Sequence, residues 1–249
     1  MLDYFYTECS NCKKHFSLPL ENHDMVTFIQ ARMSSKRLPK KSLMTISGRP
    51  MLYWVIYRVR QSLLASDLIV LTSTSRDDDE IEAFCSHEGV QCIRGDLTNV
   101  YNRFIKALFE TKAQSFIRIS GDSPLIDPAL IDQAVSLYEK SDVDIVTNTL
   151  PRSFPKGQSI EVINSKALLK LGNYRLTSEE KEHVTMGIYN RVMEFKIKNF
   201  SNFENYSTVQ LSVDSLDDLE LIRDIFQKLN TTHLSWKKAL EHGYQKLGK

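Results

Sequence analysis

Short apolar runs alternate with amphipathic segments along most of this chain, from residue 25 onward. Runs typical of buried strands lie at residues 26–31, 67–73, 90–93, 115–120 and 144–147. Segments with apolar residues at helical spacing lie between them, at residues 51–64, 77–88, 98–113 and 128–138. This alternation predicts an α/β fold in which helices cover a mostly parallel sheet.

The alternation becomes irregular after residue 148. Pro151 and Pro155 interrupt residues 148–157, which we predict to be a loop that begins the substrate half of the fold. Strands are predicted at residues 159–163, 195–200 and 208–213, and helices at residues 178–194 and 231–247. A further helix begins at Ser215, which forms a capping box with Asp218, so that Asp217 and Asp218 need no catalytic role.

Composition restricts the class of protein. The 249 residues carry 32 basic and 31 acidic side chains, so the net charge of +1 gives no overall field that favours nucleic acid or an anionic membrane. We find no apolar run long enough for a membrane span and no secretory signal, and expect a cytoplasmic protein. Four cysteines do not make a disulfide framework in a chain of this size. We expect one domain at residues 25–249.

Residues 1–24 read as an N-terminal extension to that domain. Cys9 and Cys12 form a single CxxC, with His15 and His23 downstream, a spacing that zinc sites use. A second CxxC that would complete a zinc ribbon is absent. We therefore favour a tail or a short docking segment with incidental thiols over a zinc site.

The densest chemistry follows the first predicted strand. Five cations lie between residues 32 and 41, namely Arg32, Lys36, Arg37, Lys40 and Lys41. Residues 25–66 contain no Asp or Glu, so these cations have no counter-charge nearby in the chain and suit a polyphosphate ligand. Glycine-rich phosphate motifs are absent, which leaves phosphate binding to side chains. The alternative is a solvated basic surface loop.

Four strings extend the pattern around this loop. They are QARMSSKRLPKKSL (30–43), RISGDSPLID (118–127), EKEHVT (180–185) and SVDSLDDLELI (212–222). In this order they resemble the signatures of cytidylyltransferases that make CMP-activated sugars, above all the branch named for spore coat polysaccharide protein SpsF, and more distantly the CMP-Kdo and CMP-sialic acid synthetases. The resemblance implies a Rossmann-like nucleotidyltransferase (GT-A-like) fold and a reaction that joins CMP from CTP to a sugar with release of pyrophosphate.

The resemblance also implies roles for individual residues. Nucleotide-binding positions would be Ala31, Arg32, Ser35, Arg37, Lys41, Arg94, Asn102, Arg103 and Ser120. Sugar-binding positions would be Gln158, Glu161 and His183. Catalysis would depend on Arg32, Lys41, Asp122 and Asp214, of which the two aspartates would hold Mg²⁺ or, alternatively, Mn²⁺. A structural role is the alternative for His183, and surface positions are the alternative for Arg94 and Arg103.

The two aspartates also stand out without the resemblance. Each follows a strand-like run, so both can lie at carboxyl ends of strands, on the side where α/β sheets bind ligands. The alternative is that each only caps the next turn, but Ser215 already serves as the helix cap after Asp214. Asp77, Asp78 and Asp79 are better explained as an acidic first helical turn than as a metal site.

The substrate and the assembly are less closely specified. Lys156 and Ser159 stand where the family has acidic residues, which leaves the sugar open; we expect an acidic sugar for surface polysaccharide synthesis. Two alternatives are a glycosyltransferase that uses a nucleotide-sugar and a catalytically silent sugar-nucleotide-binding subunit. The resemblance implies a homodimer with CTP and a small sugar as its ligands.

Overall fold

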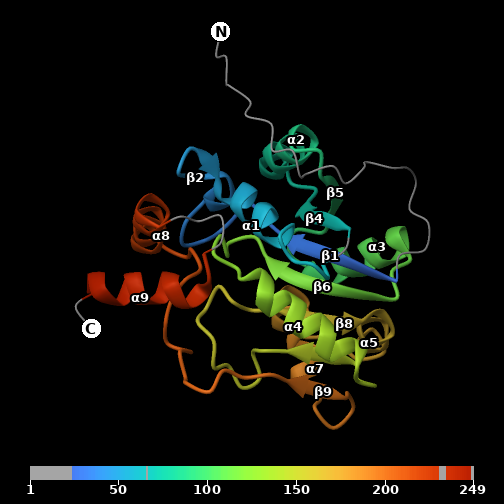
Figure 1. The fold of residues 1–249 in the computed structure, drawn as a ribbon. Coiled ribbons are helices and arrows are strands. Elements are labelled where there is room, and N and C mark those ends of the chain that lie inside the picture. The colour runs from blue at the N-terminus through green and yellow to red at the C-terminus, as the bar shows by residue number, and fades with distance from the viewer. Residues whose placement is uncertain (1–23, 66, 230–233, 248–249) are drawn as a thin grey trace.

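A computed structural model describes residues 24–65, 67–229 and 234–247 (Figure 1). One seven-stranded sheet runs through this part of the chain. Its order is β5 (Gln91–Gly95), β4 (Leu68–Ser73), β1 (Met25–Gln30), β6 (Ser115–Ser120), β8 (Glu161–Asn164), β7 (Ile145–Thr147) and β9 (Ile197–Asn199). Neighbouring strands are parallel except at β8, which is antiparallel to both β6 and β7. The predicted α/β fold with a mostly parallel sheet is confirmed.

Helices cover both faces of the sheet because its central strands alternate apolar side chains between two cores. One core joins Ile29 and Ile119 to α1 (Met51–Val59), α2 (Asp79–His87) and α4 (Pro128–Glu139). The other joins Phe28 and Phe116 to α3 (Val100–Thr111), α5 (Ser165–Leu171) and α7 (Met186–Tyr189). Strands buried on both faces in this way are rich in apolar residues, and β1 and β6 carry polar side chains chiefly at their ends and at Thr27 and Arg118.

A third core lies beyond the ends of the strands. It joins the hairpin of β2 (Thr45–Ile46) and β3 (Arg49–Pro50) to α8 (Leu216–Lys228) and α9 (Trp236–Leu247), which lie beside one another at the edge of the molecule (Figure 1). Arg58 fastens α1 to this layer, because its buried guanidinium donates to the carbonyl oxygens of Ile126 and Leu234.

The order of the strands identifies where a ligand should bind. From β1 the chain moves outward to β4 and β5, and then returns to place β6 on the other side of β1. The direction of winding therefore reverses between β1 and β6, where Gln30 and Ser120 lie opposite each other at the carboxyl ends. In open α/β sheets the crevice at such a switch point is the usual ligand site.

The predicted helix at residues 178–194 is wrong. The structure has two short helices, α6 (Ser178–Glu182) and α7, separated at Val184, whose φ of 40° lies in the left-handed region. This break turns the Val184 side chain into the core around α3 and leaves the preceding His183 exposed. Burial of one valine thus overrides the helical spacing of the sequence.

Other boundaries also differ. The helix predicted at residues 51–64 ends at Val59, beyond which Leu63 and Leu64 are exposed. Residues 208–213 do not form a strand, because only Gln210 makes a β-bridge, to Lys156. The β2–β3 hairpin turns at Ser47 and Gly48, both with positive φ, as a tight hairpin requires. This hairpin and α5 were not predicted.

Two sequence predictions concern parts of the chain that the structure does not describe. The CxxC at Cys9 and Cys12 lies outside the described residues, as do the first residues of the helix predicted at 231–247, whose described part is α9. Among the helices that the structure describes, none has the length and apolarity that crossing a membrane would need.

Candidate active site

A cleft of about 330 Å³ opens at the carboxyl ends of β1 and β6, at the switch point of the sheet. Its basic lining residues are Arg32, Lys36, Arg37, Lys41 and Arg103, and its acidic ones are Asp122, Glu182 and Asp214. The other lining residues are Gln30, Ala31, Ser35, Ser42, Val100, Ser120, Gly121 and His183. Cations thus outnumber carboxylates around a space that suits a polyanion.

The basic loop is held in place by its apolar residues and by one buried carboxylate. Met33 and Leu38 are buried at either end of the polar segment between them. Asp78, fully buried at the start of α2, accepts hydrogen bonds from the Met33 backbone N–H at 2.7 Å and from the backbone N–H and hydroxyl of Ser73. The Asp78 side chain therefore anchors the loop. Its position in the sequence predicts a role at the start of α2, but its side chain makes no capping hydrogen bond to that helix.

Lys41 is the centre of the polar network in the cleft. It opens the 3-10 turn η1 (Lys41–Leu43), and its side chain is only 11% exposed. Its ammonium lies 2.9 Å from Asp122 Oδ2, 3.0 Å from Asp214 Oδ1 and 2.6 Å from the carbonyl oxygen of Val213. These three contacts use all three hydrogen-bond donors of a lysine.

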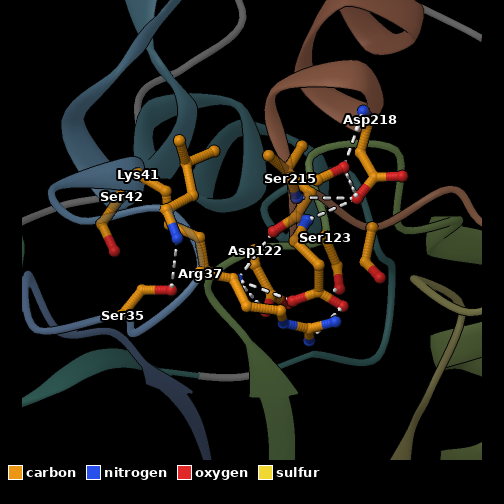
Figure 2. A network of polar contacts seen from close by, with 12 residues as sticks. Ser35, Arg37, Lys41, Ser42, Asp122, Ser123, Ser215 and Asp218 are labelled. Atoms are coloured by element: carbon orange, nitrogen blue, oxygen red, sulfur yellow. Dashed lines mark hydrogen bonds and ion pairs between the residues drawn. The ribbon is translucent and has the colours of Figure 1, made fainter.

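The two aspartates reach Lys41 from segments far apart in sequence. Figure 2 shows Asp122 and Ser215 in the polar network around Lys41. Asp122 follows β6, and Asp214 precedes Ser215, the N-terminal cap of α8. The backbone of the two segments is joined by a hydrogen bond from Val213 N–H to the carbonyl oxygen of Asp122. Asp218 accepts from the backbone N–H groups of Asp214 and Ser215, which fixes the turn that presents the Asp214 carboxylate.

The charge state of Asp214 follows from this arrangement. Partial burial acts to raise the pKa of the Asp214 carboxyl, but the hydrogen bond and charge of Lys41, together with Arg37, outweigh burial and lower it. Arg37 lies 3.0 Å from Asp214 Oδ2, so both oxygens of this carboxylate face cations. Asp214 is therefore ionised at neutral pH and can bind a cation.

Most of the loop cations meet carboxylates supplied by distant segments. Arg32 lies 2.8 Å from Glu182 on α6, and Lys40 pairs with Glu80 at 3.1 Å, on the exposed surface. The cations have no acidic neighbours in residues 25–66, and within the described part of the folded chain distant segments supply carboxylates to all of them except Lys36. The Lys40 side chain lies outside the polar network around Lys41, although the two residues are adjacent in sequence.

Arg103 lies at the base of the cleft and is almost fully buried. Burial lowers the pKa of its guanidinium to about 10, so the side chain remains charged at neutral pH. It donates to the carbonyl oxygens of Asp96 and Leu97, which leaves donor capacity toward the cleft that it lines. A Cβ at Gly95 would lie 2.9 Å from Arg103 Cγ, so the glycine is needed for this placement.

Gly121 allows the two central strands to end side by side. A Cβ added to Gly121 would lie 2.8 Å from the carbonyl oxygen of Gln30 and 3.0 Å from Cβ of Ala31. The Gly121 N–H donates to that same carbonyl at 2.8 Å. The glycine thus brings Asp122 to the wall of the cleft, opposite the basic loop.

Two of the residues assigned to nucleotide binding are not brought to the cleft. Arg94 pairs with Asp79 and Glu82 at 2.6 Å each and donates to the carbonyl oxygens of Ser73 and Ser75, which fastens β5 to α2. Asn102 is exposed on α3 and is absent from the cleft lining. The other assigned positions, Ala31, Arg32, Ser35, Arg37, Lys41, Arg103 and Ser120, all line the cleft.

The residues assigned to the sugar are separated by the fold. His183 lines the cleft, whereas Gln158 is fully buried, where its amide accepts from Asp127 N–H and donates to the carbonyl oxygen of Leu125. Both functions of the Gln158 side chain are therefore used to hold the loop around residue 158 against the start of α4. Gln158 does not line the cleft.

Glu161 lies behind the cleft wall, in a buried polar cluster. It pairs with Arg118 and accepts a hydrogen bond from Tyr189, whose pKa burial raises well above its ordinary value. Arg118 in turn donates to Gln30 Oε1 at 3.0 Å, and Gln30 lines the cleft. Glu161 thus reaches the cleft only through Arg118 and Gln30.

Sequence patterns missed several lining residues. Glu182 lies within the EKEHVT string but was not singled out, although an acidic residue next to His183 was an available signal. Gln30, Ser42 and Gly121 were not assigned either, although they lie within the strings at residues 30–43 and 118–127, and Val100 lies outside all four strings. The topology of the sheet is what brings them to the cleft.

The carboxylate oxygens around Lys41 suit a divalent metal ion whose remaining ligands would come from a bound nucleotide and water. Asp122 and Asp214 place carboxylate oxygens about one ammonium group, and both side chains are about one quarter exposed, which gives access from the cleft. Within residues 24–65, 67–229 and 234–247, no group of three or more His, Cys, Asp or Glu side chains could hold a metal ion. Mg²⁺ suits such a site, because it commonly takes one or two carboxylates and fills its remaining positions with phosphate oxygens and water.

Comparisons with known proteins agree with this geometry. A family model described as cytidylyltransferase matches residues 26–241. The spore coat polysaccharide biosynthesis protein SpsF of Bacillus subtilis is 32% identical over 215 residues, which are 83% of this chain and 88% of that protein. A 3-deoxy-manno-octulosonate cytidylyltransferase of Bdellovibrio bacteriovorus is 30% identical over 142 residues, 56% of each chain. The solved structure of a cytidylyltransferase from Leptospira borgpetersenii serovar Hardjo-bovis matches with a TM-score of 0.85 at 26% identity, over 91% of this chain and 96% of that one.

Proposed function

This chain belongs to the cytidylyltransferase family, and from that premise we propose that it joins CMP from CTP to an acidic sugar, with release of pyrophosphate. The observation that carries the proposal is the convergence of Lys41, Asp122 and Asp214 at the switch point of the sheet. This is where a triphosphate and its metal would meet the basic loop.

The chain's own cations account for binding of the triphosphate. Arg32, Arg37 and Lys41 come from one anchored loop and line one wall of the cleft, and Arg103 lies at its base. Arginine forks and a lysine ammonium are the side chains that best stabilise phosphate oxygens. Their placement on a loop fixed by Asp78 limits the reorganisation that binding would need.

In the transfer, a hydroxyl oxygen of the sugar attacks the α-phosphorus, and the bond between that phosphorus and the oxygen bridging to the β-phosphate breaks. The electron pair of the broken bond leaves with pyrophosphate, and the hydroxyl proton is released. His183 lines the cleft, and an imidazole can accept that proton. Arg32 and Lys41 stabilise the charge that develops on the departing pyrophosphate, so catalysis relies on positioning and electrostatics.

Asp122 and Asp214 would hold Mg²⁺, with Mn²⁺ as an alternative. A divalent ion bound there supplies neutralisation of phosphate charge and a template that orients the phosphates. Arg94 and Asn102 are left out of the proposed nucleotide site because they lie away from the cleft. Gln158 is assigned to the scaffold for the same reason.

An acidic sugar is favoured by the charge of the cleft and by one relative. Five basic side chains line the cleft against three acidic ones, and Lys36 is exposed on the same loop. The Bdellovibrio relative is named for 3-deoxy-manno-octulosonate, which is a sugar acid. The similarity to SpsF suggests a role in surface polysaccharide synthesis. A homodimer, a cytoplasmic location and a single domain at residues 25–249 stay predictions.

A pyrophosphate-release screen tests this function. The protein would be assayed with CTP, UTP, ATP and GTP against panels of acidic and neutral sugars, with Mg²⁺ and with excess EDTA. We expect release only with CTP, only with metal, and chiefly with acidic sugars. Release with UTP but not CTP, release limited to neutral sugars, or no release from any pair would contradict the proposal.

A further inference from the structure

The contacts of Lys41 compete with both ligands of the proposed site. A metal ion would need the two carboxylates, and a nucleotide phosphate would need the ammonium. Its three donors are used by Asp122, Asp214 and the Val213 carbonyl, so in this state it has no donor left for a phosphate. The carboxylate oxygens that it contacts are also the ones that would face a metal. The ammonium therefore occupies the position of a cation between the two aspartates.

We infer that Lys41 is a built-in competitor for the metal site, which nucleotide binding removes by drawing the ammonium onto the triphosphate. The inference rests on the proposed function, in that it takes Asp122 and Asp214 as the metal-binding pair. Without nucleotide, a divalent ion must displace Lys41 from both carboxylates. With nucleotide, the same lysine has phosphate oxygens to move to.

The geometry around the ammonium supports such an exchange. The contact with the Val213 carbonyl at 2.6 Å involves no carboxylate and can persist when the two carboxylates are released. The Met44 backbone N–H donates to the Lys41 carbonyl oxygen, which fixes the turn that carries Lys41. The exchange therefore requires movement of the Lys41 side chain only. The side chain is 11% exposed and borders the cleft, so phosphate oxygens can approach it.

The consequence is that metal binding and nucleotide binding are coupled more strongly than direct contact between the two ligands would make them. A ligand that removes a competitor raises the affinity of the second ligand, and the effect is reciprocal. Metal binding would thus be weak until CTP is present.

Binding of Mn²⁺ alone, followed by electron paramagnetic resonance of the free ion, tests this inference without turnover. Lys41→Met removes the competing charge, and Lys40→Met is the matched control because Lys40 pairs with the exposed Glu80 and does not line the cleft. We expect Lys41→Met to bind Mn²⁺ at least tenfold more tightly than the unaltered chain in the absence of nucleotide, and Lys40→Met to bind it unchanged. The factor by which CTP tightens Mn²⁺ binding should fall about tenfold in Lys41→Met.

Equal or weaker Mn²⁺ binding by Lys41→Met would overturn the inference. Absence of Mn²⁺ binding from every protein, with and without CTP, would instead remove the metal assignment on which it rests. Failure of the pyrophosphate screen is distinguishable from both, because Mn²⁺ binding is measured without any sugar.

A measurement on the unaltered chain covers the case in which Lys41→Met does not fold. The rate at which an amine-reactive ester modifies Lys41 would be followed by mass spectrometry, with Lys40 as the internal control. Saturating Mn²⁺ alone should speed modification of Lys41 severalfold by freeing its amine, and Mn²⁺ with CTP should slow it below the starting rate. An unchanged rate with saturating Mn²⁺ would contradict the inference.

Discussion

At the scale of single residues, neighbours in sequence have different roles because the fold separates their side chains. Lys40 and Lys41 are adjacent, yet one reaches the surface and the other the centre of the cleft. A left-handed backbone at Lys40, with φ of 62°, starts the turn that parts them. The run of cations alone does not distinguish Lys40 from Lys41. The resemblance to the family does, because it places Lys41 at a nucleotide-binding position.

The first prediction contrasts these two lysines. Lys41→Ala should lower the turnover of pyrophosphate release by a factor on the order of 10² to 10³, the scale for loss of one charge-stabilising group. Lys40→Ala should change turnover by less than about twofold, because an exposed ion pair contributes little. Steady-state rates with saturating CTP measure both. Equal small losses would mean that the loop is only a basic surface.

The second prediction separates Gln158 from His183, which the sequence had grouped as sugar-binding. Gln158→Ala should lower the free energy of unfolding by about 2–4 kcal/mol, because it leaves two buried backbone groups without partners. The KM for the sugar should remain within about twofold, as expected when no substrate contact is lost. His183→Ala should raise that KM, and lower turnover because the proposed proton acceptor is lost, without loss of stability. Urea denaturation and initial rates distinguish the two; a raised sugar KM in a fully stable Gln158→Ala would contradict it.

At the scale of elements, sequence patterns predicted the strands and helices whose bounds depend on local interactions. The central strand β6 was predicted with its observed bounds, and β1, β4 and α4 to within a residue or so, because apolar runs and caps determine them. The segment at residues 178–194 failed because burial of Val184 is a tertiary effect. Likewise, Asp122 and Asp214 converge through a contact between a strand end and a segment that forms no strand, joined by the hydrogen bond from Val213 N–H to the Asp122 carbonyl oxygen, and periodicity does not reveal such a contact.

The third prediction concerns the cap of α6, which carries Glu182 and His183 to the cleft. Glu180 pairs with Arg191 at 2.6 Å and accepts from the Thr177 N–H, and these contacts lower the pKa of its carboxyl to about 2. Since the folded pKa lies below the unfolded value near 4.5, the stabilisation is complete above pH 4.5 and is lost as pH falls toward 2. Glu180→Gln should be less stable at pH 7 by about 1–3 kcal/mol.

Urea denaturation across this pH range tests the cap. The difference in stability between the unaltered chain and Glu180→Gln should narrow as pH falls from 4.5 toward 2. Glu179→Gln, one position earlier on the exposed side, is the matched control and should follow the unaltered chain. A difference that is the same at every pH would show that the carboxylate charge of Glu180 is not the cause.

At the scale of the whole molecule, the C-terminal helix supports the site from behind. Trp236 at the start of α9 is buried against Phe154 and Tyr206, with ring centroids 5.6 and 5.5 Å away. Its backbone N–H donates to Asp127, the N-terminal cap of α4. The loops that carry Phe154 and Tyr206 pair with each other near Gln210, close in sequence to Asp214. Packing of α9 thus stabilises the segment that presents a proposed metal ligand.

The fourth prediction tests this support. Trp236→Ala should lower the free energy of unfolding by about 3–5 kcal/mol, the usual cost of removing a buried tryptophan side chain. Lys238→Ala, two residues further and exposed, should change stability by less than about 0.5 kcal/mol. Chemical denaturation of the full chain measures both. A small loss in Trp236→Ala would mean that α9 packs only loosely on these loops.

The most direct test of the proposed function follows the α-phosphorus itself. The chain would be incubated with Mg²⁺, an acidic sugar found active in the screen, and CTP labelled at the α-phosphorus. We predict that the label passes to a CMP-sugar in a one-to-one ratio with pyrophosphate, and that an Asp122→Asn, Asp214→Asn double variant transfers almost none. Label recovered only as free CMP or CDP, or full transfer by the double variant, would contradict cytidylyl transfer at this cleft.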